Sequence, residues 1–130
     1  DTLLRQLQQG EKDKVLVLSE PLCDLTIRRQ IFSDIIRDYT VIDGRQAQVL
    51  IKPHPRDVLD YRKEFPQHIV LDGKFPMEIL NYIPGLSFKR VVSVFTVPNG
   101  ILFADEILFL GEDFMDRYEA PELHRQNEQI

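Results

Sequence analysis

Four short runs of apolar residues recur along this 130-residue chain, and they constrain its fold more than any other feature. Each run is rich in valine, isoleucine and leucine, as buried β-strands are. A strand that is apolar throughout is typical of a parallel sheet that is covered on both faces. The runs occupy residues 14–18, 48–51, 68–71 and 90–95. One or two further extended segments are predicted at 101–104 and 107–110, with Asp105-Glu106 interrupting them.

The stretches between the runs are long enough to hold crossover helices. Between residues 25 and 39 the apolar side chains recur three and four apart, which is typical of an amphipathic helix that Asp24 or Thr26 can cap. Two more helices are predicted, one over residues 58–65 and one over residues 76–83.

This alternation predicts an α/β, Rossmann-like fold, in which a parallel sheet with right-handed connections carries helices on both faces. If the strand order is 3-2-1-4-5, the topological switch point lies between the first and fourth strands, and ligands of such sheets bind there, outside the carboxyl ends of the strands. Six polar residues are expected in the loops at this point, the last of them in a turn at 98–100: Ser19, Glu20, Asp24, Ser93, Thr96 and Asn99.

The length of the chain predicts one domain. We expect a linker or short helix over residues 1–14, the domain itself over 15–111, and a polar, partly helical tail over 112–130. The first residue is Asp1 and not Met, which suggests a processed chain or a piece of a longer one.

Charge and composition disfavour several classes of protein. A net charge of −5 argues against a general nucleic-acid-binding surface, because neutralising phosphates needs clustered lysine and arginine. No apolar run approaches the roughly 18 residues of a membrane-spanning helix, so we expect a soluble protein. The single cysteine, Cys23, excludes an internal disulfide and is compatible with a reducing compartment.

The most distinctive stretch follows the second apolar run and has the sequence Lys52-Pro53-His54-Pro55-Arg56-Asp57. Its two prolines end the strand and hold the residues before them in extended conformations, so His54 is presented on a short, stiff arm. Lys52 and Arg56 place positive charge beside the imidazole, and Asp57 can cap the helix that follows. The plainer interpretation is a strand-to-helix turn whose histidine is merely solvated.

Further polar side chains are predicted near the same edge of the sheet. Glu78 lies in the first turn of the third helix, and Ser93 and Thr96 lie at the end of the fourth strand. A nucleoside monophosphate suits such a set, because cations, imidazole and hydroxyls bind a phosphate and a carboxylate accepts from ribose hydroxyls. Each also has a structural alternative: Glu78 can stabilise a helix dipole, and Ser93 and Thr96 can be ordinary strand residues.

Other common sites are disfavoured by the sequence pattern. The first strand is followed by Ser19-Glu20-Pro21-Leu22, and not by G-x-G-x-x-G; neither a P-loop nor a nucleophile elbow occurs. His54, His68 and His124 lack the spacings of metal ligands. We therefore expect neither NAD nor a metal cofactor.

The stretch from Lys52 to Asp57 resembles the K-P-H-P-R-[DE] motif of bacterial GT-B sialyltransferases, above all the lipooligosaccharide sialyltransferases of glycosyltransferase family 52. Ser19-Glu20-Pro21-Leu22 is similar to the Q-P-L segment of that family, and Phe75-Pro76-Met77-Glu78 to its P-x-E segment. The segment Ser93-Val94-Phe95-Thr96 lies where the family carries a pair of hydroxyls. The resemblance covers about residues 14–110, and the K-P-H-P-R core is its most specific part.

The resemblance implies a carboxyl-terminal, donor-binding half of a GT-B enzyme whose donor is CMP-sialic acid. His54 would contact the donor phosphate and help CMP to leave, Glu78 would hold the ribose, and Ser93 and Thr96 would bind the phosphate. Two departures stand out: the hydroxyls are not adjacent here, and the chain has no room for the acceptor-binding domain of a complete enzyme. Asp24 is the one residue in the loop after the first strand that is placed to act as a base, with helix capping as the alternative.

The implied setting is the synthesis of bacterial surface polysaccharide or lipooligosaccharide, in the cytoplasm or at the inner face of the membrane. The implied partners are the nucleotide-sugar donor, a glycan acceptor and the missing acceptor domain, and a homo-oligomer stays open. A fragment of this kind is expected to be inactive alone. Two other hypotheses remain: a CDP-glycerol-type polyol-phosphate transferase, which also carries K-P-H-P and releases CMP, and a Rossmann-like interaction module without a ligand.

Overall fold

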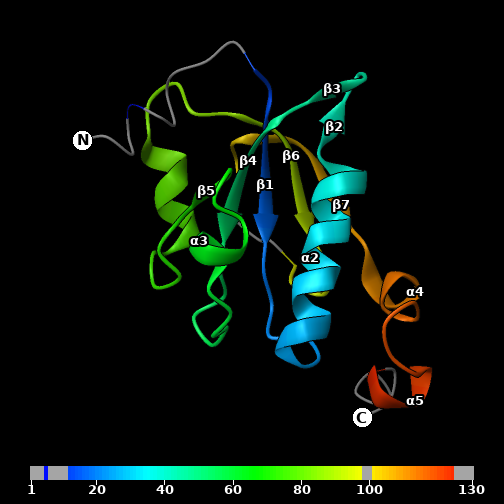
Figure 1. The fold of residues 1–130 in the computed structure, drawn as a ribbon. Coiled ribbons are helices and arrows are strands. Elements are labelled where there is room, and N and C mark those ends of the chain that lie inside the picture. Colours follow the sequence, from blue (N-terminus) through cyan, green and yellow to red (C-terminus); the bar gives the residue numbers. More distant parts are fainter. Residues whose placement is uncertain (1–4, 6–11, 98–100, 125–130) are drawn as a thin grey trace.

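The computed structural model describes residue 5, residues 12–97 and residues 101–124. Its centre is a five-stranded parallel sheet in the order β5-β4-β1-β6-β7 (Figure 1). The strand order and the parallel pairing confirm the prediction of an α/β, Rossmann-like fold. The strands are β1 (Lys14–Leu18), β4 (Gln48–Lys52), β5 (Ile69–Val70), β6 (Phe88–Ser93) and β7 (Ala104–Phe109).

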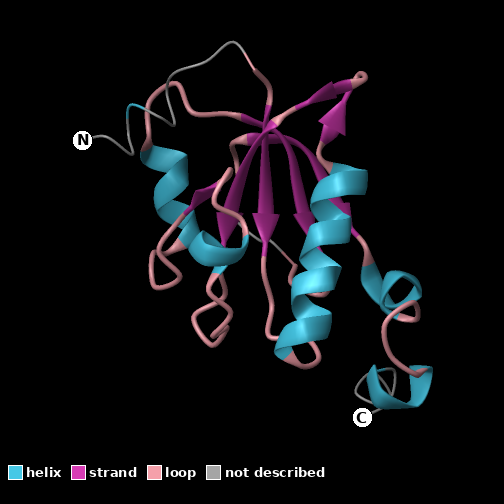
Figure 2. Ribbon diagram, in the orientation of Figure 1, coloured by secondary structure: helices cyan, strands magenta, loops and turns pink. Residues whose placement is uncertain are grey.

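Helices and a small hairpin complete the described part of the chain (Figure 2). The longest helix, α2 (Leu25–Tyr39), is followed directly by the hairpin of β2 (Val41–Ile42) and β3 (Arg45–Gln46). The remaining elements are short: α3 (Tyr61–Glu64), the 3-10 helix η1 (Met77–Tyr82), α4 (Gly111–Met115) and α5 (Pro121–His124).

Alternate residues of the central strands pack into two separate apolar clusters, one on each face of the sheet. On one face Val15 and Val17 of β1 pack with Ile31 and Phe32 of α2. On the other face Leu16 of β1 belongs to the same cluster as Leu80 of η1. Because successive side chains of a strand point to opposite faces, β1 is buried on both, and this is why its sequence is apolar throughout.

The long helix agrees with the sequence prediction, and the two shorter helices do not. The carboxylate of Asp24 accepts the Ile27 N–H at 2.8 Å and caps α2, so Asp24 and not Thr26 is the capping residue. The predicted helix over 58–65 shrinks to α3, which Asp60 caps and not Asp57. The segment predicted as a third α-helix is the 3-10 helix η1, which spans Met77–Tyr82.

One strand, β7, takes the place of the one or two extended segments predicted at 101–104 and 107–110. The sequence predicts an interruption at Asp105-Glu106, but both residues lie inside β7. An edge strand has one unpaired side, and β7 is largely exposed, so it accepts charged residues that a central strand excludes. The turn predicted at 98–100 lies outside the described residues.

The core extends beyond residue 111, where the sequence predicted a polar tail. Phe114 and Met115 of α4 are buried in the cluster that includes α2. The tail is helical in part, as expected, since α5 follows α4. Most of the predicted linker over 1–14 lies outside the described residues. None of the helices in the described ranges has the length and apolar character needed to cross a bilayer.

A histidine beside the sheet makes stability depend on pH. His68 precedes β5 and is partly buried, and burial lowers its pKa below 6.5. The unfolded chain then binds more protons than the folded protein, so His68 makes the free energy of unfolding rise with pH in the window just below 6.5.

We expect His68→Gln to remove this rise. Urea unfolding of both proteins from about pH 5 to pH 7 tests it, and a pH-independent difference between them would contradict the assignment.

Candidate functional site

A cavity of about 230 Å³ opens at the carboxyl end of the sheet, where β1 and β4 end side by side. Leu18 and Lys52 are paired at the last register position of these two strands. The loops after β1, β4, β5 and β6 and the start of η1 supply the rest of the lining. The polar side chains around the cavity are those of Ser19, Lys52, His54, Lys74, Glu78 and Thr96.

His54 lies at the mouth of this cavity. It is held between Pro53 and Pro55, and these three residues are called the arm below. Its backbone N–H donates to Ser19 Oγ at 3.1 Å, and its ring Nδ1 accepts the Arg56 backbone N–H at 3.0 Å. An amide N–H can only donate, so Nδ1 carries no proton in this arrangement. The ring proton of the neutral imidazole therefore sits on Nε2, which makes Nε2 a hydrogen-bond donor for a ligand.

Lys52 ends β4 and is buried, with 7% of its surface exposed. Its Nζ donates to the carbonyl of Gly73 at 2.8 Å and to that of Pro53 at 3.2 Å. Burial lowers the pKa of Lys52, and the nearby carboxylates of Asp72 and Glu78 oppose this shift. The lysine thus joins the arm to the loop after β5 and places an ammonium group in the wall of the cavity.

Gly73 lets these two segments come together. A Cβ at this position would lie 3.3 Å from the Pro53 carbonyl oxygen and 3.6 Å from that of His54. Because glycine has no side chain, the backbone of the loop after β5 can approach the backbone of the arm this closely.

Glu78 lies in the first turn of η1, on the rim of the same cavity, and is exposed. The loop from Gly73 to Met77, which also lines the cavity, connects it to the end of β5. The cavity therefore has a carboxylate on one wall and an imidazole and an ammonium group on others.

The two predicted hydroxyls have different surroundings. Thr96 lines the cavity, whereas Ser93 is buried and its Oγ donates to the Thr96 carbonyl at 2.6 Å. Ser93 ends β6, and the loop that follows it is held by Glu20, whose Oε2 accepts the backbone N–H groups of Val94 at 3.1 Å and Phe95 at 2.9 Å. Glu20 thereby bridges the loops after β1 and β6 across the switch point.

Of the seven predicted site residues, four line the cavity: Lys52, His54, Glu78 and Thr96. Ser93 lies behind it. The exposed side chain of Arg56 is not part of the lining, and neither is that of Asp24, which caps α2. Asn99 lies outside the described residues.

Sequence reasoning missed the role of Asp57. Its side chain is fully buried and contacts Ser19, Arg28 and Tyr61. Burial and the hydrogen bond to Asp57 raise the pKa of Tyr61, so this phenol remains a donor. The four-residue spacing of Asp57 and Tyr61 is the one local signal, because Ser19 and Arg28 are 38 and 29 residues away in the chain.

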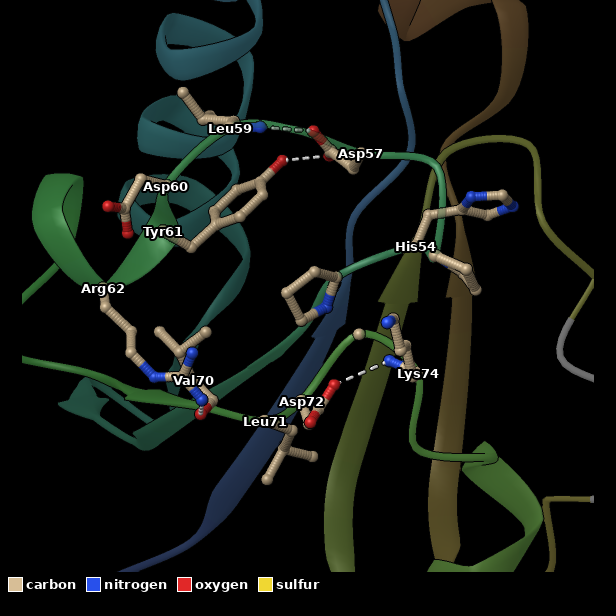
Figure 3. Close-up of a pocket in the computed structure, with 13 residues that line it drawn as sticks. His54, Asp57, Leu59, Asp60, Tyr61, Arg62, Val70, Leu71, Asp72 and Lys74 are labelled. Carbon is tan, nitrogen blue, oxygen red and sulfur yellow. Dashed lines mark hydrogen bonds between the residues drawn. The ribbon is translucent and has the colours of Figure 1, made fainter.

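A second cavity, of about 280 Å³, lies along the other flank of the arm. Figure 3 shows Tyr61 and Asp72 on this side, while the imidazole of His54 points away from Tyr61. The two cavities share the residues of the arm and of the Gly73–Lys74 turn. The arm therefore forms a wall between two depressions at the same edge of the sheet.

Comparison with known proteins gives one relative, an uncharacterized protein of Haemophilus influenzae. It is 33% identical over 98 residues, a match that covers 72% of this chain and 30% of the relative. The chain thus spans about a third of the length of the relative that it matches. No family model and no solved structure matches the chain.

Among the residues that the structure describes, no group of three or more His, Cys, Asp or Glu side chains could hold a metal ion. The chemistry available at the cavity is that of hydrogen-bond donors, two lysines and a carboxylate.

The protonation pattern of His54 can be measured directly. We expect Nδ1 of the neutral ring to be unprotonated and Nε2 to carry the proton, because the Arg56 amide occupies Nδ1. Long-range ¹H–¹⁵N correlation spectra of the histidine rings distinguish the two tautomers, and His54→Gln assigns the signal. Finding the proton on Nδ1 would contradict this geometry.

Proposed function

We propose that this chain is the donor-binding unit of a bacterial glycosyltransferase of the sialyltransferase type, with CMP-sialic acid as its donor. The observation that carries the proposal is the gathering of Lys52, His54, Glu78 and Thr96 around one cavity at the carboxyl end of a parallel sheet. Ligands of such sheets bind at this edge. The K-P-H-P-R-D stretch that resembles family 52 supplies two of the four residues.

In this proposal the phosphate of CMP lies against His54. The sugar carbon forms a bond to the acceptor hydroxyl oxygen, whose proton goes to a base, as its bond to the phosphate oxygen breaks. The bonding electrons go to the phosphate oxygen, and negative charge grows on the phosphate. The Nε2–H of His54 and the Thr96 hydroxyl donate to it, and Lys52 adds positive charge. Donors that are already in place stabilise such charge better than water, which must reorganise.

Glu78 binds the ribose of the nucleotide in this proposal. A carboxylate has two oxygens that can each accept from one ribose hydroxyl, and Glu78 lies on the cavity rim, where a ribose next to the phosphate would fall. Ser93 acts indirectly, through the Thr96 carbonyl that it holds, and Asp24 is left to capping. A second domain of the parent enzyme binds the acceptor glycan, sets the linkage and supplies the base that activates the acceptor. The parent enzyme works in surface-polysaccharide synthesis at the cytoplasmic side of the membrane.

Calorimetric titration of the 130-residue chain tests the donor. We expect CMP and CMP-sialic acid to bind, with His54→Ala and Glu78→Gln each weakening CMP about 10-fold or more, since each removes a hydrogen bond involving a charged group. His68→Ala and Glu122→Gln are the matched controls outside the cavity and should bind like the wild type.

Two outcomes would replace the proposal. Binding of CDP-glycerol in preference to CMP-sialic acid would favour a polyol-phosphate transferase. Failure of every cytidine nucleotide to bind, with His54→Ala and Glu78→Gln behaving like the wild type in every assay, would favour an interaction module without a nucleotide.

A further inference from the structure

The carboxylate of Asp57 is the meeting point of four segments of the chain. Its Oδ1 accepts from Arg28 Nη1 of α2 at 2.9 Å and from the Leu59 backbone N–H at 3.1 Å. Its Oδ2 accepts from Ser19 Oγ at 2.8 Å and from Tyr61 Oη of α3 at 2.6 Å. These four bonds fill the acceptor sites of a carboxylate whose side chain is 0% exposed.

The bond from Ser19 connects Asp57 to His54. Ser19 Oγ donates its proton to Asp57 and accepts the backbone N–H of His54 at 3.1 Å. The hydroxyl therefore joins the buried carboxylate to the residue that carries the imidazole. The orientation of the Ser19 hydroxyl, with its proton toward Asp57 and a lone pair toward His54, follows from the charge of the carboxylate.

Arg28 extends the same network into the loop after β1. Besides its ion pair with Asp57, it donates from Nε to the Leu22 carbonyl at 2.9 Å and from Nη2 to the Cys23 carbonyl at 2.7 Å. The loop that contains Ser19 and the arm that contains His54 are thus held to one buried ion pair. Neither could move alone without leaving a buried polar group unpaired, which is costly.

We propose that Asp57 is the positioning residue of this site: through Ser19 and Arg28 it holds the His54 arm in the geometry that meets the ligand phosphate. The inference rests on the proposed function for the identity of the ligand. Asp57 does not line the cavity of about 230 Å³ in which CMP is proposed to bind, so it acts through the residues that it holds. A histidine presented on an arm with two prolines gains little from the stiffness of the arm unless the base of the arm is anchored, and Asp57 supplies that anchor.

Two tyrosines of the chain provide a matched test. Tyr61 donates to Asp57 Oδ2 at 2.6 Å, and Tyr118 donates to Asp34 Oδ2 at 2.6 Å, away from the cavity. Replacing either one by phenylalanine removes one phenol-to-carboxylate hydrogen bond and keeps the ring. Neither tyrosine lines the cavity of about 230 Å³ in which CMP is proposed to bind, and Tyr61 lines the second cavity, on the other flank of the arm. A difference between the two variants at the first cavity therefore reports on Asp57.

The experiment compares Tyr61→Phe and Tyr118→Phe in the 130-residue chain. We expect both to lower the melting midpoint, Tyr118→Phe by roughly 4 °C and Tyr61→Phe by more, because the carboxylate of Asp57 is fully buried and that of Asp34 is not. Only Tyr61→Phe should shift the ¹H and ¹⁵N signals of the His54 ring in the absence of ligand. Only Tyr61→Phe should also weaken CMP in calorimetry, by about threefold or more.

A second pair of variants covers the case in which Tyr61→Phe does not fold. Ser19→Ala removes the hydroxyl between Asp57 and His54, and Thr40→Val removes a buried hydroxyl that donates to the Ile36 carbonyl, remote from the cavity. Ser19→Ala should shift the His54 signals and Thr40→Val should not.

The positioning role is overturned if the His54 signals of a folded Tyr61→Phe or Ser19→Ala variant match the wild type, or if Tyr118→Phe shifts them equally. Failure of the wild type to bind CMP would overturn the proposed ligand alone, because the ring signals are read without ligand. Unchanged CMP affinity in Tyr61→Phe, with shifted His54 signals, would show that the anchor does not control binding and would also overturn the proposal.

Discussion

The site depends on the parallel pairing of β1 with a strand on each side. Because β1 pairs with both β4 and β6 in the same direction, the carboxyl ends of all three strands meet at one edge of the sheet. Three loops that are far apart in the sequence are thereby brought together. Glu20 closes the gap between the loops after β1 and β6, and the Asp57 network closes the gap between those after β1 and β4.

The buried ion pair beneath the arm gives this edge its rigidity at an energetic cost. Removing a charge from water is unfavourable, and the Arg28–Asp57 pair offsets it with further hydrogen bonds on both partners. Replacing such a pair by apolar residues can leave a fold equally stable, whereas removing one partner costs about 3–5 kcal/mol. This pair lies at the base of the candidate site, and the tyrosine comparison separates a positioning role from a purely structural one.

Much of the fold could be predicted because the burial of a strand or helix determines the pattern of apolar residues in its sequence. Residues 14–18 are apolar on both faces since β1 is covered on both, and α2 shows its apolar stripe because only one side packs on the sheet. The errors fall where that pattern is weak. At β7 the exposed edge tolerates Asp105 and Glu106, and around α3 the side chain expected to cap the helix is engaged elsewhere.

The sequence by itself determined the central strands, the long helix and the rigid arm with its histidine, because these follow from local pattern and backbone sterics. The order of the strands in the sheet was settled by the tertiary structure. Only the tertiary structure decided which polar groups share a cavity. It places Thr96 in the lining and Ser93 behind it, and it makes Asp57 an anchor and not a cap. The reason is that a buried carboxylate takes whichever donors the packed fold brings to it, and two of the four donors of Asp57, Ser19 and Arg28, lie at least 29 residues away in the chain.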